Sequence, residues 1–185
     1  VAELVALAKA RPGELSYGSA GPGSSNQLAI ELFSKAAGIK LNHVPYKGGG
    51  PVLNDLLAGH IPMIVISQPL VLEHVRAGKL KALAVMGKTR SAAIPNVASM
   101  KEQGYPDVDV SSWIGVLVPA ATPDAVVRRL HAGIETATQA KSFKEQMEKA
   151  GFIVKTSKPA EFDAFIKGEY ERWKPIVHEL GIVVD

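Results

Sequence analysis

The sequence contains no cysteine, so disulfide bonds, thiolate metal ligands and a cysteine nucleophile are excluded. No apolar run approaches the roughly 20 residues that a membrane helix needs. The formal net charge is only +3, and the basic residues are spread along the chain without interleaved aromatics, which argues against a nucleic-acid partner. The 185 residues, 46% of them hydrophobic, suffice for one medium globular domain or two small lobes.

The histidines lack the spacing of paired metal ligands on one helix turn, so neither a metal nor another cofactor is expected. They are His43, His60, His74, His131 and His178.

A glycine- and serine-rich turn, residues 19–25, lies between a short β-prone run and an apolar-periodic helix over 28–37. Its glycines allow a sharp backbone turn, and Ser24 and Ser25 can cap the helix that follows. The N–H groups of a helix start attract anions, so the turn predicts a carboxylate site. The alternative is an ordinary strand-to-helix connection, because the glycine spacing matches neither a P-loop nor a dinucleotide fingerprint.

The remaining pattern predicts a succession of strand, loop and helix. Strands are expected at 14–18, 41–44, 62–66, 80–86, 110–118 and 152–154. Helices are expected at 1–10, 28–37, 51–59, 98–103, 122–139 and 142–150. A further helix ends at Gly78, and another begins at 157 and continues through Trp173. Thr122 is predicted to be an N-cap and Gly38 a C-cap.

Three successive strand–loop–helix units predict a parallel sheet with helices on its faces. In such sheets ligands bind at the carboxyl ends of the strands. The loops at 19–25, 46–50 and 67–68 are therefore expected to share one edge. The composition changes near Pro119, beyond which the pattern is helical and lacks glycine-rich turns.

Five stretches in the same order carry a family resemblance: 17–24, 44–49, 76–85, 95–106 and 113–123. Together they resemble the Bug-type solute-binding receptors of tripartite tricarboxylate transporters. The resemblance runs from Val1 to about Ile182, nearly the whole chain.

The resemblance implies an α/β, periplasmic-binding-protein-like (Venus flytrap) fold. Residues 1–112 are then the second lobe, with its parallel sheet, flanking helices and ligand-facing loops. Residues 113–185 are the crossover strand and the C-terminal helical part that returns to the first lobe. Family members carry about another lobe before the position of Val1, including the opposite jaw, so we expect this chain to lack the N-terminal lobe and any export signal. Exposed lobe surfaces are then expected to associate.

The resemblance also implies a receptor, not an enzyme, in the periplasm. Its ligand is a small organic anion, a di- or tricarboxylate or an aromatic acid, which it passes to the membrane permease subunits of a tripartite transporter. Where relatives have an acidic residue this chain has Ile66, which argues against amino acids as ligands. The candidate ligand-binding residues are Ser19, Ala20, Gly21, Gly23, Ser24, Ser25, Tyr46, Gly48, Ser67 and Gln68.

Individual residues have simpler readings. Tyr46 is equally well explained as a half-buried aromatic on the sheet, Lys47 as a solvated charge and Trp113 as a packing residue.

An α/β hydrolase-like enzyme, with Ser19 or Ser24 as nucleophile and His43 as base, is the alternative function. It requires a Gly-x-Ser-x-Gly elbow, which Gly-Ser-Ala-Gly does not supply. A signalling receptor of the same fold is a second alternative.

Overall fold

A computed structural model describes residues 1–182. They form two compact units, one made by 1–112 with 180–182 and the other by Trp113–Glu179. The predicted segment 113–185 thus ends in three residues, 183–185, that lie outside the described ones. In chain order the elements are α1 (Ala2–Ala10), β1 (Ser16–Ser19), α2 (Ser25–Ala37), β2 (Asn42–Pro45), α3 (Gly49–Leu57), α4 (Gln68–Arg76), α5 (Asp124–Gln139), α6 (Lys141–Lys149) and α7 (Pro159–Glu179).

The sheet of the first unit is parallel. β1 pairs with β2 in a register that sets Tyr17 opposite His43 and Ser19 opposite Pro45. On its other side β1 makes a single parallel bridge, from Gly18 to Ile64. The carboxyl ends of all three segments consequently lie at one edge.

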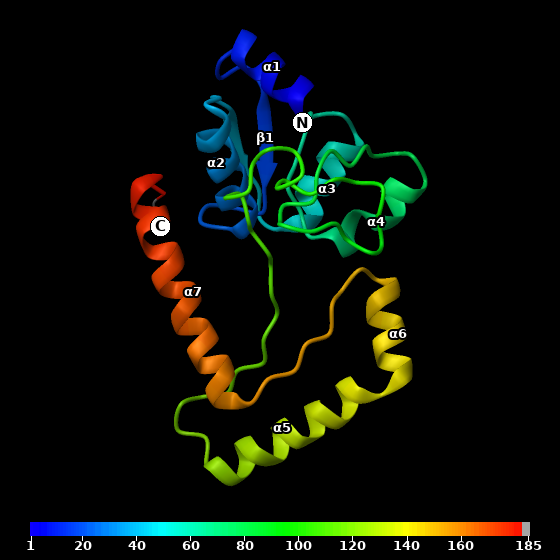
Figure 1. Cartoon of the computed structure of the whole chain (residues 1–185), viewed down its shortest axis with the longest axis vertical. Coiled ribbons are helices and arrows are strands. Elements are labelled where there is room, and N and C mark those ends of the chain that lie inside the picture. The colour runs from blue at the N-terminus through cyan, green and yellow to red at the C-terminus, as the bar shows by residue number, and fades with distance from the viewer. Residues whose placement is uncertain (183–185) are drawn as a thin grey trace. The chain divides into compact units, whose positions relative to one another are not determined.

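Helices α2 and α3 cover opposite sides of β1 (Figure 1). Side chains alternate along a strand. Tyr17 faces α2, where its hydroxyl donates a 2.6 Å hydrogen bond to Glu31 Oε1. Gly18 faces the other way, and a Cβ at this position would overlap Val52 Cγ2 of α3 and lie 2.6 Å from Ile61 Cδ1. The missing side chain lets α3 pack directly on the strand.

The core of this unit forms where α2 meets the loop after residue 98. Phe33 and Ala37, one helical turn apart, pack with Met100 and Val108, and all four are buried. Phe33 also contacts Tyr105 edge to face, with ring centroids 5.2 Å apart. α2 ends at Gly38, the predicted C-cap, whose backbone is left-handed.

Four segments that were predicted to be strands do not form continuous β-ladders. The run 62–66 keeps only the bridge at Ile64, and 80–86 keeps one bridge, from Val85 to Ser99. Within the described residues, 110–118 and 152–154 form no strand. Apolar content predicted buried strands there, yet Ile114 is 83% and Ile153 94% exposed, and no neighbouring segment pairs with their backbones.

Three helix predictions also need correction. The stretch 98–103 is a single turn, in which the Ser99 N–H donates to Glu102 Oε2 at 2.8 Å. That bond, the Ser99 hydroxyl and Arg90 lower the pKa of Glu102. α2 begins at Ser25 instead of residue 28. α5 begins at Asp124 with Pro123, not Thr122, as its N-cap.

The second unit is built from helices and extended connections. Trp113 packs edge to face against Phe162 and Phe165 of α7, at centroid distances of 5.7 and 5.4 Å. His131 of α5 lies with Nε2 2.9 Å from the carbonyl oxygen of Ser157. Within residues 1–182, no helix has both the length and the apolar character that a membrane crossing needs.

Candidate functional site

The three predicted loops meet at the carboxyl edge of the sheet. The Tyr46 N–H donates to the Ser19 carbonyl at 3.1 Å, and the Gly48 N–H donates to the Ala20 carbonyl at 2.9 Å. The third loop is brought to the same edge by the contact between the starts of α3 and α4. A Cβ on Gly49, the first residue of α3, would lie 3.0 Å from Cδ1 of Leu70 in α4. Strand order and backbone hydrogen bonds therefore bring the candidate residues from all three loops to one place.

The first loop is shaped by Gly21 and Ser24. Gly21 has a φ of 134°, and a Cβ there would lie 3.1 Å from the Tyr46 carbonyl oxygen. The Ser24 hydroxyl donates to the Gly21 carbonyl at 2.6 Å and accepts from the Gln27 N–H at 3.4 Å. Ser24 is thus the N-cap of α2, and its side chain also closes the preceding turn.

Three helices begin at this edge and direct the positive ends of their dipoles toward it. In α2, the Ser24 hydroxyl and carbonyl take the N–H groups of Gln27 and Leu28. Within residues 1–182, the N–H groups of Ser25 and Asn26 have no acceptor. The N-caps of α3 and α4, Gly48 and Ser67, supply no side-chain hydrogen bond. Unused backbone donors suit an anionic ligand.

Ser19 and Ser25 differ in what they can offer a ligand. Ser19 is fully buried, and its hydroxyl bonds within its own loop, to the Gly21 carbonyl and N–H at 3.2 Å each. Ser25 is partly exposed, and its hydroxyl lies 3.2 Å from that of Ser112. Ser19 supports the loop from inside, whereas Ser25 lies at its surface.

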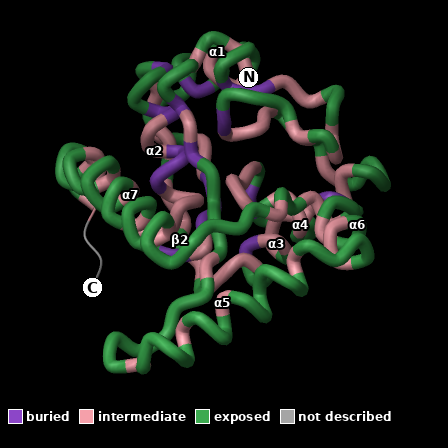
Figure 2. The backbone as a smooth tube through the Cα atoms, turned by 60° about the horizontal axis from the view of Figure 1, so that its bottom comes forward, coloured by how far each residue is buried: buried purple, intermediate pink, exposed green. Residues whose placement is uncertain are grey.

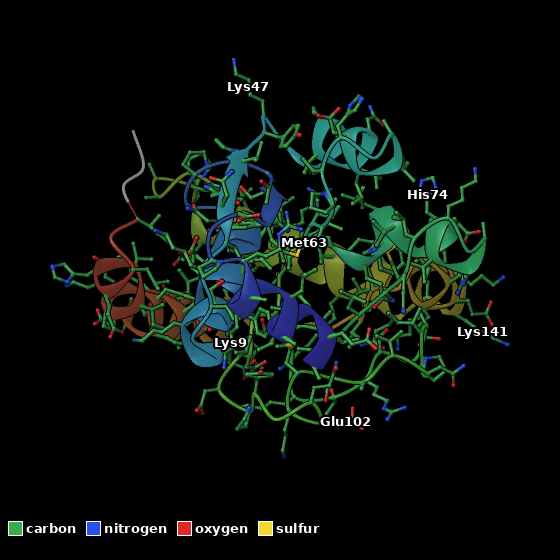
Figure 3. All side chains as sticks on the ribbon, turned by 90° about the horizontal axis from the view of Figure 1, so that it is seen from above. Lys9, Lys47, Met63, His74, Glu102 and Lys141 are labelled. Carbon is green, nitrogen blue, oxygen red and sulfur yellow. The ribbon has the colours of Figure 1, made fainter. Side chains whose placement is uncertain are left out.

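The second loop holds Tyr46 and Lys47. The Tyr46 hydroxyl donates to Asp55 Oδ2 of α3 at 2.7 Å, which raises the pKa of Tyr46. The same bond, with a second from His60, lowers the pKa of Asp55. Lys47 is exposed, and its side chain extends away from the ribbon (Figure 3).

In the third loop, Ser67 is exposed and precedes α4. Gln68 opens that helix, and its Nε2 is buried with no hydrogen-bond partner among the described residues. A buried amide nitrogen without an acceptor is costly in a folded protein. The amide therefore has an unused donor at the edge where the loops meet.

His43 and Gln27 also lie at this edge, although neither is among the predicted ligand-binding residues and His43 is named only as the base of the alternative enzyme. His43 Nε2 lies 2.7 Å from Ser19 Oγ, and His43 Nδ1 lies 3.3 Å from Gln27 Nε2. The ring stacks on Tyr17 at 4.9 Å. Burial lowers the pKa of His43, and the charge of Glu31 opposes this shift.

The sequence carried a signal for Gln27 alone. Ser24 and Gln27 have the spacing of a capping box, in which the third residue reaches back to the start of the helix. Here Gln27 Oε1 accepts from the Gly23 N–H at 2.8 Å. His43 had no such signal, because its role depends on the pairing of β1 with β2.

The Ser19–His43 pair has the separation that the hydrolase alternative requires, but its surroundings do not fit a nucleophile. Ser19 is fully buried. The group at the other ring nitrogen is the amide of Gln27, where a triad places a carboxylate. Among the described residues, no cluster of three or more His, Asp or Glu side chains could hold a metal ion.

A parallel sheet edge surrounded by helix starts is typical of ligand-binding α/β proteins, and the structural neighbours of this chain are periplasmic-binding-protein folds. The chain matches the structure of R. palustris Rpa4515 with adipate at a TM-score of 0.93 and 29% identity, over 99% of this chain and 61% of that one. It matches the periplasmic binding protein BugD at a TM-score of 0.88 and 28% identity, over 98% of this chain and 62% of that one. The predicted fold class is confirmed.

The chain belongs to the family described as tripartite tricarboxylate transporter family receptor, whose profile matches residues 1–182. Protein BugT of Bordetella pertussis is 38% identical over 178 residues, which are 96% of this chain and 55% of that relative. The chain spans about half the length of the curated relatives it matches. The predicted Bug-type resemblance is confirmed, and the family and its structural neighbours are solute-binding receptors, not enzymes.

Proposed function

We propose that the chain is part of a periplasmic solute-binding protein that captures a small organic carboxylate and presents it to the membrane subunits of a tripartite transporter. The observation that carries the proposal is the convergence of three helix N-termini at one sheet edge, with the Ser25 and Asn26 N–H groups unused. The bound adipate of the R. palustris relative supports a dicarboxylate as the ligand class.

In this proposal the ligand carboxylate lies over the start of α2 and accepts backbone hydrogen bonds there. The Gln68 amide supplies a further donor, and Ser19 and Tyr46 hold the loops instead of touching the ligand. The residues proposed to line the site are Ala20, Gly21, Gly23, Ser24, Ser25, Gly48, Ser67 and Gln68.

We also propose that the unit containing 1–112 is the second lobe and that Trp113–Glu179 belongs to the first. The exposed apolar stripe of α5 supports this, because a segment that returns to another lobe needs such a surface. The stripe comprises Val126, Leu130 and Ile134, which are 45%, 46% and 38% exposed. Parts of separate lobes are expected to unfold in separate transitions.

The carboxylate site is tested by calorimetric titration of the 185-residue chain with adipate and, in parallel, with uncharged 1,6-hexanediol. The informative variant is Ser25→Asp, since an acidic residue in the first turn favours the helix but repels an anionic ligand. We expect adipate to bind, hexanediol not to bind, and Ser25→Asp to weaken adipate about tenfold or more.

The matched control is Ala160→Asp, which makes the same charge change in the first turn of α7, in the other unit. It should leave adipate affinity unchanged. Equal affinity of the wild type and Ser25→Asp for adipate, or equal binding of adipate and hexanediol, would rule out the anion site at α2.

A further inference from the structure

The imidazole of His43 bridges the two ends of the glycine loop. On one side its Nε2 lies 2.7 Å from Ser19 Oγ, which also bonds to Gly21. On the other side its Nδ1 lies 3.3 Å from Gln27 Nε2, and Gln27 Oε1 holds the Gly23 N–H at 2.8 Å. One side chain of β2 thereby fixes a loop that lies on β1 and α2.

The hydrogen bonds determine the proton positions on this ring. Gln27 Oε1 accepts from the Gly23 N–H, so the Gln27 amide nitrogen faces the ring and donates to His43 Nδ1. An accepting Nδ1 requires a neutral imidazole with its proton on Nε2. That proton goes to Ser19 Oγ, whose own hydrogen goes to the Gly21 carbonyl. Each hydrogen in this series of contacts, from Gly23 through Gln27, His43 and Ser19 to Gly21, then meets an acceptor.

We propose that His43 is the positioning residue of the carboxylate site, and that protonation of its ring releases the glycine loop and weakens ligand binding. This inference rests on the proposed carboxylate-binding function. The neutral ring holds Gly21 and Gly23 in place, and these in turn set the start of α2, where the Ser25 and Asn26 N–H groups are free to bind.

Protonation places a second N–H on the ring, directly against the Gln27 amide NH₂. The amide must then turn to present Oε1 to His43, and the Gly23 N–H loses its acceptor. The titratable groups that face the ring are Tyr17 from β1 and Glu31 from α2. Glu31 favours the protonated ring, but its carboxylate already accepts the 2.6 Å bond from Tyr17.

The direction of the pH effect follows from burial, which lowers the pKa of His43 below its usual 6.5. The unfolded chain therefore takes up this proton before the folded chain does. The hold on the loop is complete above pH 6.5 and is lost as the pH falls through the lowered pKa.

The first test is His43→Phe, which keeps a flat ring against Tyr17 but removes both nitrogens. We expect the protection factor of the Gly23 amide against hydrogen exchange to fall about tenfold in the ligand-free chain. We also expect adipate to bind about tenfold more weakly at pH 7.5. The matched control is His74→Phe, at a histidine of α4 (Figure 3) whose side chain makes no hydrogen bond or ion pair within residues 1–182, and it should change neither quantity.

The dependence of adipate affinity on pH distinguishes a positioning role of His43 from a general contribution of its side chain to fold stability. Below pH 6.5, wild-type affinity for adipate should fall more steeply than that of His43→Phe as the pH drops through the lowered pKa of His43, and titration of adipate itself cancels in this comparison. Gln27→Glu should raise the pKa of His43 in an NMR titration and remove the acid loss of Gly23 protection, because a carboxylate accepts from both Gly23 and the protonated ring.

If His43→Phe does not fold, the pH dependence of Gly23 exchange in the ligand-free wild type takes its place: protection should fall as the pH drops through the pKa of His43, and Gln27→Glu should remove that fall. Unchanged Gly23 protection in His43→Phe, wild-type protection that does not fall with pH, or parallel pH profiles of adipate affinity would overturn the inference. Failure of the wild type to bind any carboxylate would overturn the proposed function instead, while the Gly23 measurement, made without ligand, still decides the role of His43.

Discussion

Gly18 is the residue at which β1 comes closest to α3. Replacement by alanine would place a Cβ against Val52 Cγ2 and 2.6 Å from Ile61 Cδ1. Both neighbours are buried, so they have little space to move. Overpacking of this kind costs about 1–3 kcal/mol. We expect Gly18→Ala to lower the free energy of unfolding in urea by that amount.

Gly133→Ala is the control for this prediction. Gly133 lies inside α5, and a Cβ there would meet nothing within 4 Å. Alanine is the better helix former, so the variant should be neutral or slightly stabilised. Equal stability of Gly18→Ala and Gly133→Ala would show that β1 and α3 do not depend on this close approach.

Residues that act through local sequence were predictable, and those that act through strand pairing were not. Ser24 caps α2 because of its position beside a helical pattern, and Gly21 marks a turn. His43 contacts Ser19 and Gln27 only because β2 lies parallel to β1 in one particular register. Without that register, His43 was paired with Ser19 or Ser24 only in the hydrolase alternative, and nothing in the sequence indicated its contact with Gln27.

At the scale of elements, the extended segment after residue 112 packs on α7 through aromatic contacts. Trp113 packs against Phe162 and Phe165 of α7. Contacts of this kind contribute about 0.5–1.5 kcal/mol beyond the buried area. In a Trp173→Phe background, so that Trp113 is the only emitter, we expect Phe162→Ala to shift the tryptophan emission to the red. Tyr170→Ala, at a 61% exposed position on the same helix, should leave the emission unchanged.

If neither Phe162→Ala nor Tyr170→Ala shifts the emission, Trp113 does not pack on α7 in solution. A red shift in both variants would point to fraying of the whole helix, which circular dichroism at 222 nm would reveal.

Helices were easier to predict than strands for a physical reason. A helix satisfies its backbone within one segment, so periodicity and caps suffice to place α2, α5 and α7. A strand satisfies its backbone only through a neighbour. The apolar run 110–118 has the composition of a strand but, in the described chain, forms no β-bridge and keeps one backbone hydrogen bond to a neighbouring segment, from the Val110 N–H to the Met86 carbonyl. Composition could not supply that information.

At the scale of the whole molecule, burial is distributed unequally. All core residues of the first unit lie at or before Val110, and none of the described residues 111–182 is buried. The purple, buried stretches in Figure 2 accordingly include those near α2 and α3. Apolar burial is the main source of folding stability. The unit Trp113–Glu179 is therefore expected to be much less stable than the unit formed by 1–112.

The distribution of tryptophan makes this inequality measurable, because both tryptophans, Trp113 and Trp173, belong to the less stable unit. In urea, the intrinsic fluorescence transition should precede the main loss of circular dichroism, since two-state unfolding would require coincident curves. A Tyr105→Trp probe, in a background with both native tryptophans replaced by Phe, reports on the core around Phe33 and should follow the later transition.

Adipate should shift that later transition alone, because the proposed site lies entirely on 1–112. Coincident transitions for both probes would mean that the second unit gains its stability from the first, and the assignment of the two units to separate lobes would then have to be withdrawn.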